Sequence, residues 1–339
     1  MNEKIVITGA TGMLGGEVAL QLARAGYRDI TLPVRNPARL TRLLGRMKAE
    51  ELDTKVLHPV EVSLSFPADV TEMMRGAAGL FHCAAVVDFG DRDNNMVAGN
   101  VEITSTLVDA ALACRVRRMV HVSSIATLGV GDPPGSPVTE RNPLESIDGQ
   151  PPYTVSKVLA EQQVRRGIEQ GLDAVIVHPS VILGEGEWRG AGSCAVVRLV
   201  SSGLPFYTTG TTGYVDVRDV ARAMIALADC ERAKGENFIL NGANVPFREL
   251  ITLAARTAGK PRPRFKAGKA LLYTMYGLER ALSVVGYRPR FPRLAVRSAV
   301  TETRYDGDKI RSFVPFQYTP FDQTLRRVVT AYLNEKSAR

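Results

Sequence analysis

The sequence predicts an α/β fold in which helices cover both faces of a doubly wound parallel sheet, followed by a smaller C-terminal lobe. Two observations support this fold class. From residue 4 to residue 180, short apolar runs rich in β-branched residues alternate with helical stretches, as in parallel strands joined by crossover helices. Beyond residue 180 the alternation becomes irregular. We therefore expect one domain over 1–180, to which 214–240 return, and a second lobe formed mainly by 181–339.

The chain opens on a strand, a glycine-rich turn and a helix. An apolar run at 4–8 leads into Gly9, Gly12 and Gly15, and a helical pattern follows from residue 18 to residue 25. Such a turn holds the diphosphate of a dinucleotide, because free backbone amides and the positive end of the helix dipole face it. The expected diphosphate contacts are Gly9, Thr11, Gly12, Met13, Leu14 and Gly15. The alternative is an ordinary strand-to-helix turn.

The second and third strands carry the signals for the adenosine half of the dinucleotide. Arg35 is the first charge after the second strand (29–34), and the segment 30–44 holds no acidic residue. An acid here suits the ribose of NAD, whereas an arginine suits the 2′-phosphate of NADP, so we expect NADP. The alternative is an arginine that merely caps a loop. The third strand (55–62) carries Glu61, which we expect near the adenine amino group.

The remaining elements follow in chain order. The fourth strand (79–85) runs into Ala84 and Ala85, whose small side chains let the edge of the sheet approach the cofactor. In the first domain we expect further helices at 66–76, 97–114 and 153–170, and further strands at 118–124 and 174–179. In the second lobe we expect helices near 190–202 and 218–230, strands at 213–217 and 236–240, and an amphipathic helix at 271–285.

Composition bounds the class of protein. With 339 residues, of which 45% are hydrophobic, the chain can bury a large core. The four cysteines are scattered without a C-x-x-C pair, which favours buried thiols in a reducing, cytoplasmic compartment. The histidines stand singly, so no metal site is expected. The chain starts almost directly on a strand, which leaves no room for a signal peptide, and no apolar stretch is long enough to span a bilayer.

The net charge of +8 is unevenly distributed. Residues 256–339 hold 18 Lys and Arg against 6 Asp and Glu, a net +12, which leaves −4 for residues 1–255. We interpret the basic part as a solvated surface and expect no nucleic acid partner, because its aromatic residues form no base-stacking platform. The amphipathic helix at 271–285 is interpreted as core or as a pocket wall. A lid and a membrane-surface element are alternatives, given the basic neighbours Lys266, Lys269 and Arg280.

A tyrosine, a lysine and a serine form the candidate catalytic set. Tyr153 and Lys157 stand four residues apart, on one face of an expected helix. The pKa of a free phenol is about 10, and a nearby cation lowers it, so that Tyr153 can exchange a proton with an alcohol or ketone oxygen while hydride moves. Lys157 also binds a ribose hydroxyl in this hypothesis. Ser124, at the end of the fifth strand, can fix the substrate oxygen. A surface pair and a strand-end loop are the alternatives.

Several motifs, taken in order, resemble the extended short-chain dehydrogenase/reductase family, within the NAD-dependent epimerase/dehydratase superfamily, over nearly the whole chain. They are the three spaced glycines, FHCAA at 81–85, NVEITSTLVDA at 100–110, VSSIATLG at 122–129, YTVSK at 153–157, HPSVILG at 178–184 and YVDVRDVARA at 214–223. The resemblance implies a Rossmann domain, with Ala84, Ala85, Pro179 and Val181 at the cofactor. It also implies a Tyr–Lys–Ser set with Asn100 as helper, a C-terminal substrate lobe, and a homodimer formed through helices 100–114 and 153–170.

Within that family, SSI at 123–125 and AAVVDFG at 84–90 are most similar to the branch of 3β-hydroxysteroid dehydrogenases, dihydroflavonol reductases and cinnamoyl-CoA reductases. This implies an NADP-dependent oxidoreductase that interconverts a ketone and a secondary alcohol on an apolar substrate such as a steroid. Ser124, Val87 and Trp188 are expected at the substrate, although Trp188 can equally anchor a loop. Ala126 stands where epimerases and dehydratases of nucleotide sugars usually carry Ser or Thr, so that function is the alternative. A dinucleotide-binding protein without catalysis is the third hypothesis.

Overall fold

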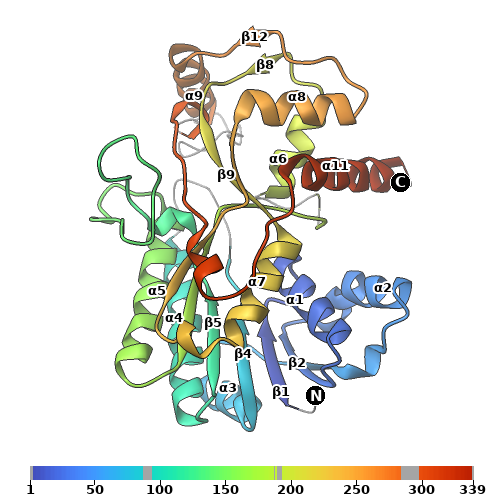
Figure 1. Cartoon of the computed structure of the whole chain (residues 1–339), viewed down its shortest axis with the longest axis vertical. Coiled ribbons are helices and arrows are strands. Elements are labelled where there is room, and N and C mark those ends of the chain that lie inside the picture. Colours follow the sequence, from blue (N-terminus) through green and yellow to red (C-terminus); the bar gives the residue numbers. More distant parts are fainter. Residues whose placement is uncertain (1–2, 87–93, 187, 189–192, 284–297, 338–339) are drawn as a thin grey trace.

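A seven-stranded parallel sheet forms the centre of the molecule (Figure 1). The computed structural model describes residues 3–86, 94–186, 188, 193–283 and 298–337. The sheet has the order β10-β6-β5-β4-β1-β2-β3. Its strands are β1 (Lys4–Thr8), β2 (Asp29–Val34), β3 (Leu57–Glu61), β4 (Ala77–His82), β5 (Arg118–Val122), β6 (Ala174–Pro179) and β10 (Asn237–Leu240). The predicted fold class is confirmed, and the strand order reverses between β1 and β4, where such sheets bind ligands outside the carboxyl ends of the strands.

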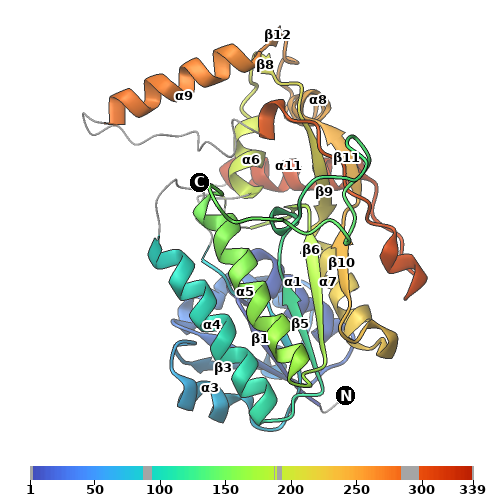
Figure 2. The ribbon, with the colours of Figure 1, turned by 90° about the vertical axis from the view of Figure 1, so that its left-hand side faces the viewer.

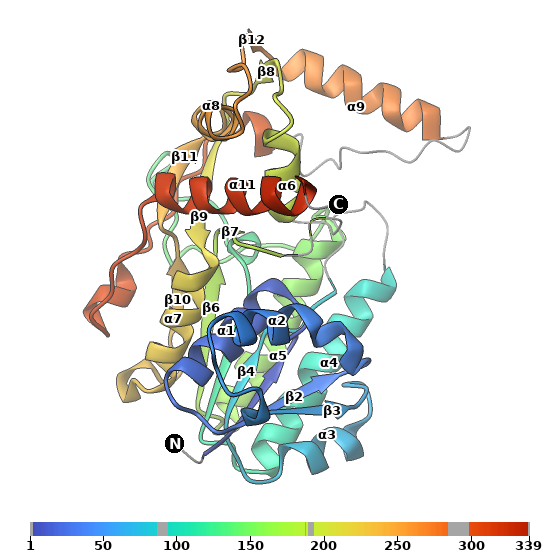
Figure 3. The same cartoon turned by 90° about the vertical axis from the view of Figure 1, so that its right-hand side faces the viewer.

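Helices cover both faces of this sheet (Figures 2 and 3). One face packs against α3 (Pro67–Met74), α4 (Asn94–Ala113) and α5 (Pro152–Glu169). The other packs against α1 (Met13–Arg24), α2 (Thr41–Ala49) and α7 (Val217–Ala228). Each layer buries its own apolar cluster, because a parallel strand is covered on both faces and its side chains alternate between them.

The first helix begins earlier than its apolar pattern predicts. We expected it from Val18, but α1 begins at Met13, directly after Gly12. Gly15 and Gly16 therefore lie inside the helix, although glycine disfavours helix interiors by about 1 kcal/mol. Gly15 is required there because a Cβ on it would lie 2.5 Å from the carbonyl oxygen of Gly9. The close approach of the turn to the helix explains why the pattern fails at this point.

The second lobe is built on small sheets at the carboxyl end of the large one. A three-stranded sheet joins β7 (Val181–Leu183), β9 (Thr211–Asp216) and β11 (Ala243–Pro246), and a two-stranded one joins β8 (Phe206–Tyr207) and β12 (Phe265–Lys266). The helices of this lobe are α6 (Ser193–Val200), α8 (Phe247–Thr257), α9 (Lys269–Ser283) and α11 (Phe321–Ser337). Between these elements the chain returns to the first domain, where α7 covers the large sheet and β10 forms its edge.

Charged groups hold the C-terminal helix in the second lobe and join it to the first domain. Asp216, buried at the end of β9, accepts two hydrogen bonds from Arg327 of α11, at 2.8 and 2.6 Å. Arg42 of α2 bonds Glu335 near the end of α11 at 2.8 Å and also the carbonyl of Gly186. Because α2 belongs to the first domain, the contacts of Arg42 join the second lobe to it. Within the described ranges, no helix combines the length and the apolar character needed to cross a bilayer.

Candidate active site

The glycine-rich turn has the geometry of an anion-binding cradle. Gly9 takes a φ of +73°, which L side chains rarely adopt, and a Cβ on it would lie 2.8 Å from the amide nitrogen of Ala84. The Gly12 amide donates to the Gly9 carbonyl at 2.9 Å, and Gly12 caps α1. Within the described part of the chain no side chain bonds the first amides of α1, and its first turn holds no acid. These amides, which include those of Met13 and Leu14, are therefore free to bind a diphosphate.

The residues expected at the adenosine half lie together at the edge of the sheet. Arg35 follows β2 directly and is exposed, and Glu61 ends β3 in register with Val34. Arg35 forms no ion pair with a residue that the structure describes. Arg42 is different, because its guanidinium already bonds Gly186 and Glu335. Arg35, at the end of β2, and Arg39, in the 3-10 helix Pro37–Leu40, are thus exposed cations without an ion pair to a described residue.

Ser124 and Tyr153 meet at the carboxyl end of the large sheet. Ser124 follows β5 and caps the short 3-10 helix Ile125–Thr127, where its hydroxyl accepts from the Ala126 amide at 3.1 Å. Tyr153 lies in the first turn of α5, and its phenol forms a hydrogen bond with the Ser124 hydroxyl. Burial raises the pKa of Tyr153, and the hydrogen bond from Ser124 opposes this only in part. The two hydroxyl groups are placed to bind one substrate oxygen between them.

Lys157 lies one turn further along α5 and is buried. Its ammonium donates to the carbonyl oxygen of Val122, the last residue of β5, at 2.9 Å. Burial lowers the pKa of Lys157 to about 8, although Cys83 and Glu161 act in the opposite direction. We expected Lys157 to make the phenol of Tyr153 acidic. In the chain alone that expectation is wrong, because burial dominates and the pKa of the phenol is raised.

Asn100 holds the segment that leaves β4. Its Oδ1 accepts from the amide of Val86 at 2.8 Å, and its Nδ2 donates to the carbonyl of Val86 at 2.9 Å. A longer contact of 3.3 Å joins Nδ2 to Ser156 of α5. Asn100 therefore positions the stretch that contains Ala84 and Ala85, which lies directly over the glycine-rich turn. The contacts of its amide group are those of a positioning residue.

A buried carboxylate under Ser124 was not anticipated from the sequence. Glu161 accepts from the hydroxyl of Ser123 at 2.6 Å, from Thr127 at 3.2 Å and from Arg165 at 2.6 Å. His178 completes the group, with its Nδ1 3.0 Å from the Thr127 hydroxyl. Burial alone raises the pKa of Glu161, but His178, Ser123 and Arg165 outweigh it and lower the pKa. Glu161 stands four residues after Lys157, so helical spacing was the signal that could have revealed it.

The buried histidines of the large sheet are held in the neutral form. His82 of β4 lies between the hydroxyls of Thr8, at 2.9 Å, and Thr104, at 3.1 Å. Burial lowers the pKa of His82 to about 3 and that of the adjacent His121 well below its usual range. The Thr8 hydroxyl also accepts from the Ala84 amide at 3.1 Å. His82 therefore serves to join β1, β4 and α4 beneath the cofactor segment.

Four further predicted site residues have different outcomes. Pro179 ends β6 and Val181 begins β7, both at the carboxyl end of the large sheet. Val87 lies outside the described residues. Trp188 is buried in the core of the second lobe, where its indole donates to Glu335 at 2.8 Å and stacks edge-on against Tyr332. These contacts place the Trp188 side chain in the core of the second lobe, against α11.

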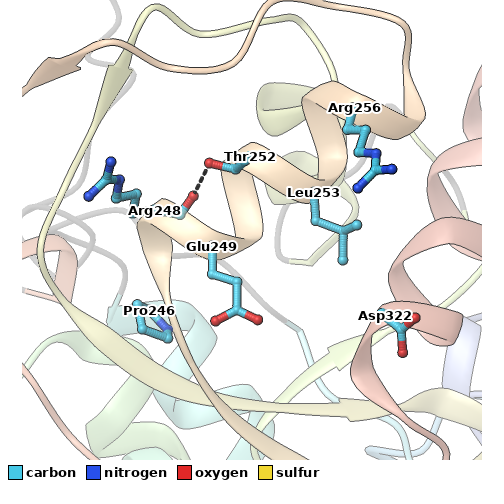
Figure 4. Close-up of a pocket in the computed structure, with 7 residues that line it drawn as sticks. All are labelled: Pro246, Arg248, Glu249, Thr252, Leu253, Arg256 and Asp322. Carbon is cyan, nitrogen blue, oxygen red and sulfur yellow. Dashed lines mark hydrogen bonds between the residues drawn. The ribbon is translucent and has the colours of Figure 1, made fainter.

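An open pocket of about 470 Å³ lies away from these groups, between α8 and the start of α11 (Figure 4). Its lining consists of Pro246, Arg248, Glu249, Thr252, Leu253, Arg256 and Asp322. Two arginines and two acidic residues line it, and neither Ser124 nor Tyr153 borders it. The group of Ser124, Tyr153 and Lys157 and this pocket are therefore separate.

Comparison with known proteins agrees with this geometry. The model of the NAD dependent epimerase/dehydratase family matches residues 5–241. A putative dihydroflavonol 4-reductase of Synechocystis is 26% identical over 98% of this chain and 96% of its own length. A 4-hydroxy-2-methyl-3-oxo-4-farnesyl-3,4-dihydroquinoline-1-oxide ketoreductase of Stigmatella aurantiaca is 30% identical over 90% of this chain and 89% of its own.

A solved structure shows the same fold. It is a dTDP-glucose 4,6-dehydratase from Streptomyces venezuelae with NAD bound, which superposes with a TM-score of 0.75 at 22% identity and covers 98% of both chains. The glycine cradle, the hydroxyl pair and the extent of the match to the family model lead to one assignment. The chain is a member of the NAD dependent epimerase/dehydratase family, with the extended short-chain dehydrogenase/reductase architecture and a site for a nicotinamide dinucleotide.

Proposed function

We propose that this protein is an NADP-dependent reductase that converts a ketone into a secondary alcohol on a fairly apolar substrate. The observation that carries the proposal is the hydrogen-bonded pair of Ser124 and Tyr153 at the carboxyl end of the sheet, one helical turn from the buried Lys157. Ketone oxygens are acceptors, and this pair offers two hydroxyl donors from rigid elements. The names of the reductases among the relatives support the same reaction class.

The roles of the chain's own residues follow from their positions. A substrate carbonyl oxygen replaces the mutual hydrogen bond and accepts from both the Ser124 and the Tyr153 hydroxyls. When bound, the dinucleotide supplies the hydride, and its oxidised nicotinamide adds positive charge beside the phenol. The Tyr153 Oη proton then passes to the substrate oxygen, which becomes the alcohol. The Lys157 ammonium is suited to stabilising the phenolate that remains, because with a pKa of about 8 it is mostly protonated, and so positively charged, at pH 7.

The raised pKa of Tyr153 favours the reductive direction. A phenol with a pKa above 10 is protonated at neutral pH and is therefore ready to donate. Alcohol oxidation requires the phenolate instead, which burial disfavours. We infer that ketone reduction is the faster direction near neutral pH, and that oxidation gains relative to reduction as the pH rises.

The preference for NADP rests on Arg35. It is exposed directly after β2, whereas Arg42, further along the chain, is bonded to Glu335 and Gly186. A guanidinium binds a phosphate through two parallel hydrogen bonds, so that Arg35 suits a ribose 2′-phosphate. Glu61 at the end of the neighbouring strand is assigned to the adenine amino group.

The preference for an apolar substrate rests on the segment after β4. Cys83, Ala84, Ala85 and Val86 carry no charged group, and the side chain of Val86 is 47% exposed. Asn100 bonds both the amide and the carbonyl of Val86, so α4 fixes the main chain of this exposed apolar residue. We also propose that the protein is cytoplasmic and that it forms a homodimer through α4 and α5.

An NADPH oxidation screen tests the proposal. Steroid, aromatic and aliphatic ketones are offered to the full chain while absorbance of NADPH is followed, and nucleotide sugars are monitored in parallel for epimerisation and dehydration. We expect ketone-dependent NADPH consumption. Turnover of a nucleotide sugar without net NADPH consumption would overturn the proposal in favour of an epimerase or dehydratase, which the family name also covers. Dinucleotide binding without turnover of any compound would support the non-catalytic alternative.

A further inference from the structure

The outer end of the second lobe exposes apolar side chains that no described element covers. This tip consists of β8, residues 260–268 and the first turns of α9, which projects from the body of the molecule (Figures 2 and 3). Phe206 and Phe265, on paired strands, are 47% and 60% exposed, with ring centroids 5.9 Å apart. Leu271, in α9, is 45% exposed. Together with Tyr273, these are half of the large hydrophobic side chains that are exposed in the described part of the chain.

The same tip carries a dense positive charge. Lys260, Arg262, Arg264, Lys266 and Lys269 are all exposed, and no acidic residue occurs between positions 257 and 278. None of the five forms an ion pair with a described residue. Single exposed cations without an ion pair to a described residue also occur elsewhere, for example Arg28 and Lys48, but five of them gather within residues 260–269 at the tip. The tip therefore offers its charge to an external partner.

We propose that the tip docks the protein on a lipid membrane that contains anionic headgroups. Lys and Arg side chains near such a surface are attracted to its negative potential, and exposed aromatic and aliphatic side chains insert at the level of the headgroups. Both kinds of side chain occur together here, and they lie at the outer end of the lobe opposite the large sheet (Figure 1). The inference goes beyond the proposed reaction and does not depend on it.

A nucleic acid fits this surface less well. It requires cations along a groove and aromatic faces open to stacking. At the tip, the rings of Phe206 and Phe265 lie tilted by 46° against each other, which forms no parallel stacking platform, and Leu271 offers no face for a base. A membrane interface uses all of these side chains, since it accepts apolar groups in any orientation.

Vesicle co-sedimentation with the full chain tests the proposal. Sucrose-loaded vesicles of phosphatidylcholine alone, or with phosphatidylglycerol, are mixed with the protein at several salt concentrations. We expect binding to the anionic vesicles that weakens as salt rises, and little binding to phosphatidylcholine. The variant Arg264→Glu, Lys266→Glu, Lys269→Glu should lower the partition coefficient by roughly a hundredfold, because each basic residue near the surface contributes about fivefold.

A matched variant controls for net charge. Arg28→Glu, Lys48→Glu, Arg115→Glu changes the charge by the same amount at the opposite end of the molecule, on exposed side chains, and should bind within about threefold of the unmodified protein because salt screens distant charges. Phe206→Ser with Phe265→Ser should weaken the binding that survives at high salt. Absence of binding to anionic vesicles, equal loss in the two charge variants, or retention of an RNA oligonucleotide in place of vesicles would each overturn the proposal.

Discussion

Replacing the buried Lys157 with methionine should stabilise the folded chain while removing its activity. The side chain is 7% exposed, and burial lowers its pKa from 10.5 to about 8. That difference corresponds to about 3 kcal/mol by which the fold disfavours the charged form. Lys157→Met removes this cost but leaves the carbonyl of Val122 without its partner, at a loss of about 1 kcal/mol. We therefore expect a free energy of unfolding higher by about 2 kcal/mol at pH 7.

The difference in the free energy of unfolding between Lys157→Met and the unmodified protein should depend on pH. Because the folded-state pKa lies below the unfolded-state pKa, the unfolded chain binds more protons between pH 8 and 10.5. The unmodified protein therefore gains stability as pH rises through this window, and Lys157→Met does not. The advantage of the variant should shrink by about 2 kcal/mol between pH 7 and pH 9.5.

Urea denaturation of both proteins at the two pH values measures the effect. Lys48→Met, on the exposed surface of α2, is the control and should change stability by less than about 0.5 kcal/mol at either pH. A Lys157→Met variant that is less stable than the unmodified protein at pH 7, or an advantage that does not change with pH, would refute the reasoning. Either result would mean that the ammonium is well solvated or paired in the fold.

Three further variants test the other parts of the site. Gly15→Ala should lower the free energy of unfolding by about 1–3 kcal/mol, because the new Cβ meets the carbonyl of Gly9. The control Gly45→Ala lies in α2 with open space around it and should be neutral or stabilising. Equal effects of the two variants in urea denaturation would contradict this prediction. Glu161→Gln should cost roughly 1–3 kcal/mol at pH 7. Because the pKa of Glu161 is lowered, its contribution to the free energy of unfolding is present above pH 4.5 and is lost as the pH falls through the lowered value. The stability curves of the two proteins should therefore converge in acid. Curves that stay parallel would contradict this role of Glu161. Arg35→Asp should weaken NADP at least about tenfold more than NAD in fluorescence titrations, and equal weakening would show that Arg35 does not contact the phosphate.

The strands of the large sheet could be predicted because their signal is local. The expected bounds of β2 and β6 coincide with Asp29–Val34 and Ala174–Pro179, since each is a short apolar run bounded by polar residues or turn formers. The helices α8 and α11 were not predicted. They form their core with each other and with α6, and two-residue strands such as β8 and β12 around them leave no periodic signal in the sequence.

The features of the candidate site also differ in whether a local sequence signal reveals them. The spacing of Tyr153 and Lys157 is a property of one helix, so the pair could be found from the sequence. The link from Arg42 to Glu335 joins residues 293 positions apart, and only the fold reveals it. The pKa of Tyr153 was expected to fall, because spacing shows a neighbouring cation but not the burial that raises it. Charge and proximity can be read from sequence, whereas desolvation depends on the packed structure.

The central claim is that the phenol of Tyr153 delivers the proton to the substrate oxygen. Single-turnover kinetics of Tyr153→Phe with NADPH and a reducible ketone from the screen test it most directly, with the dissociation constant of NADPH measured in parallel. We predict that the rate of the chemical step falls by roughly 10²–10⁴-fold, while NADPH affinity stays within about twofold because the glycine-rich turn is untouched. A rate within tenfold of the unmodified protein, with NADPH bound as tightly as before, would contradict the account.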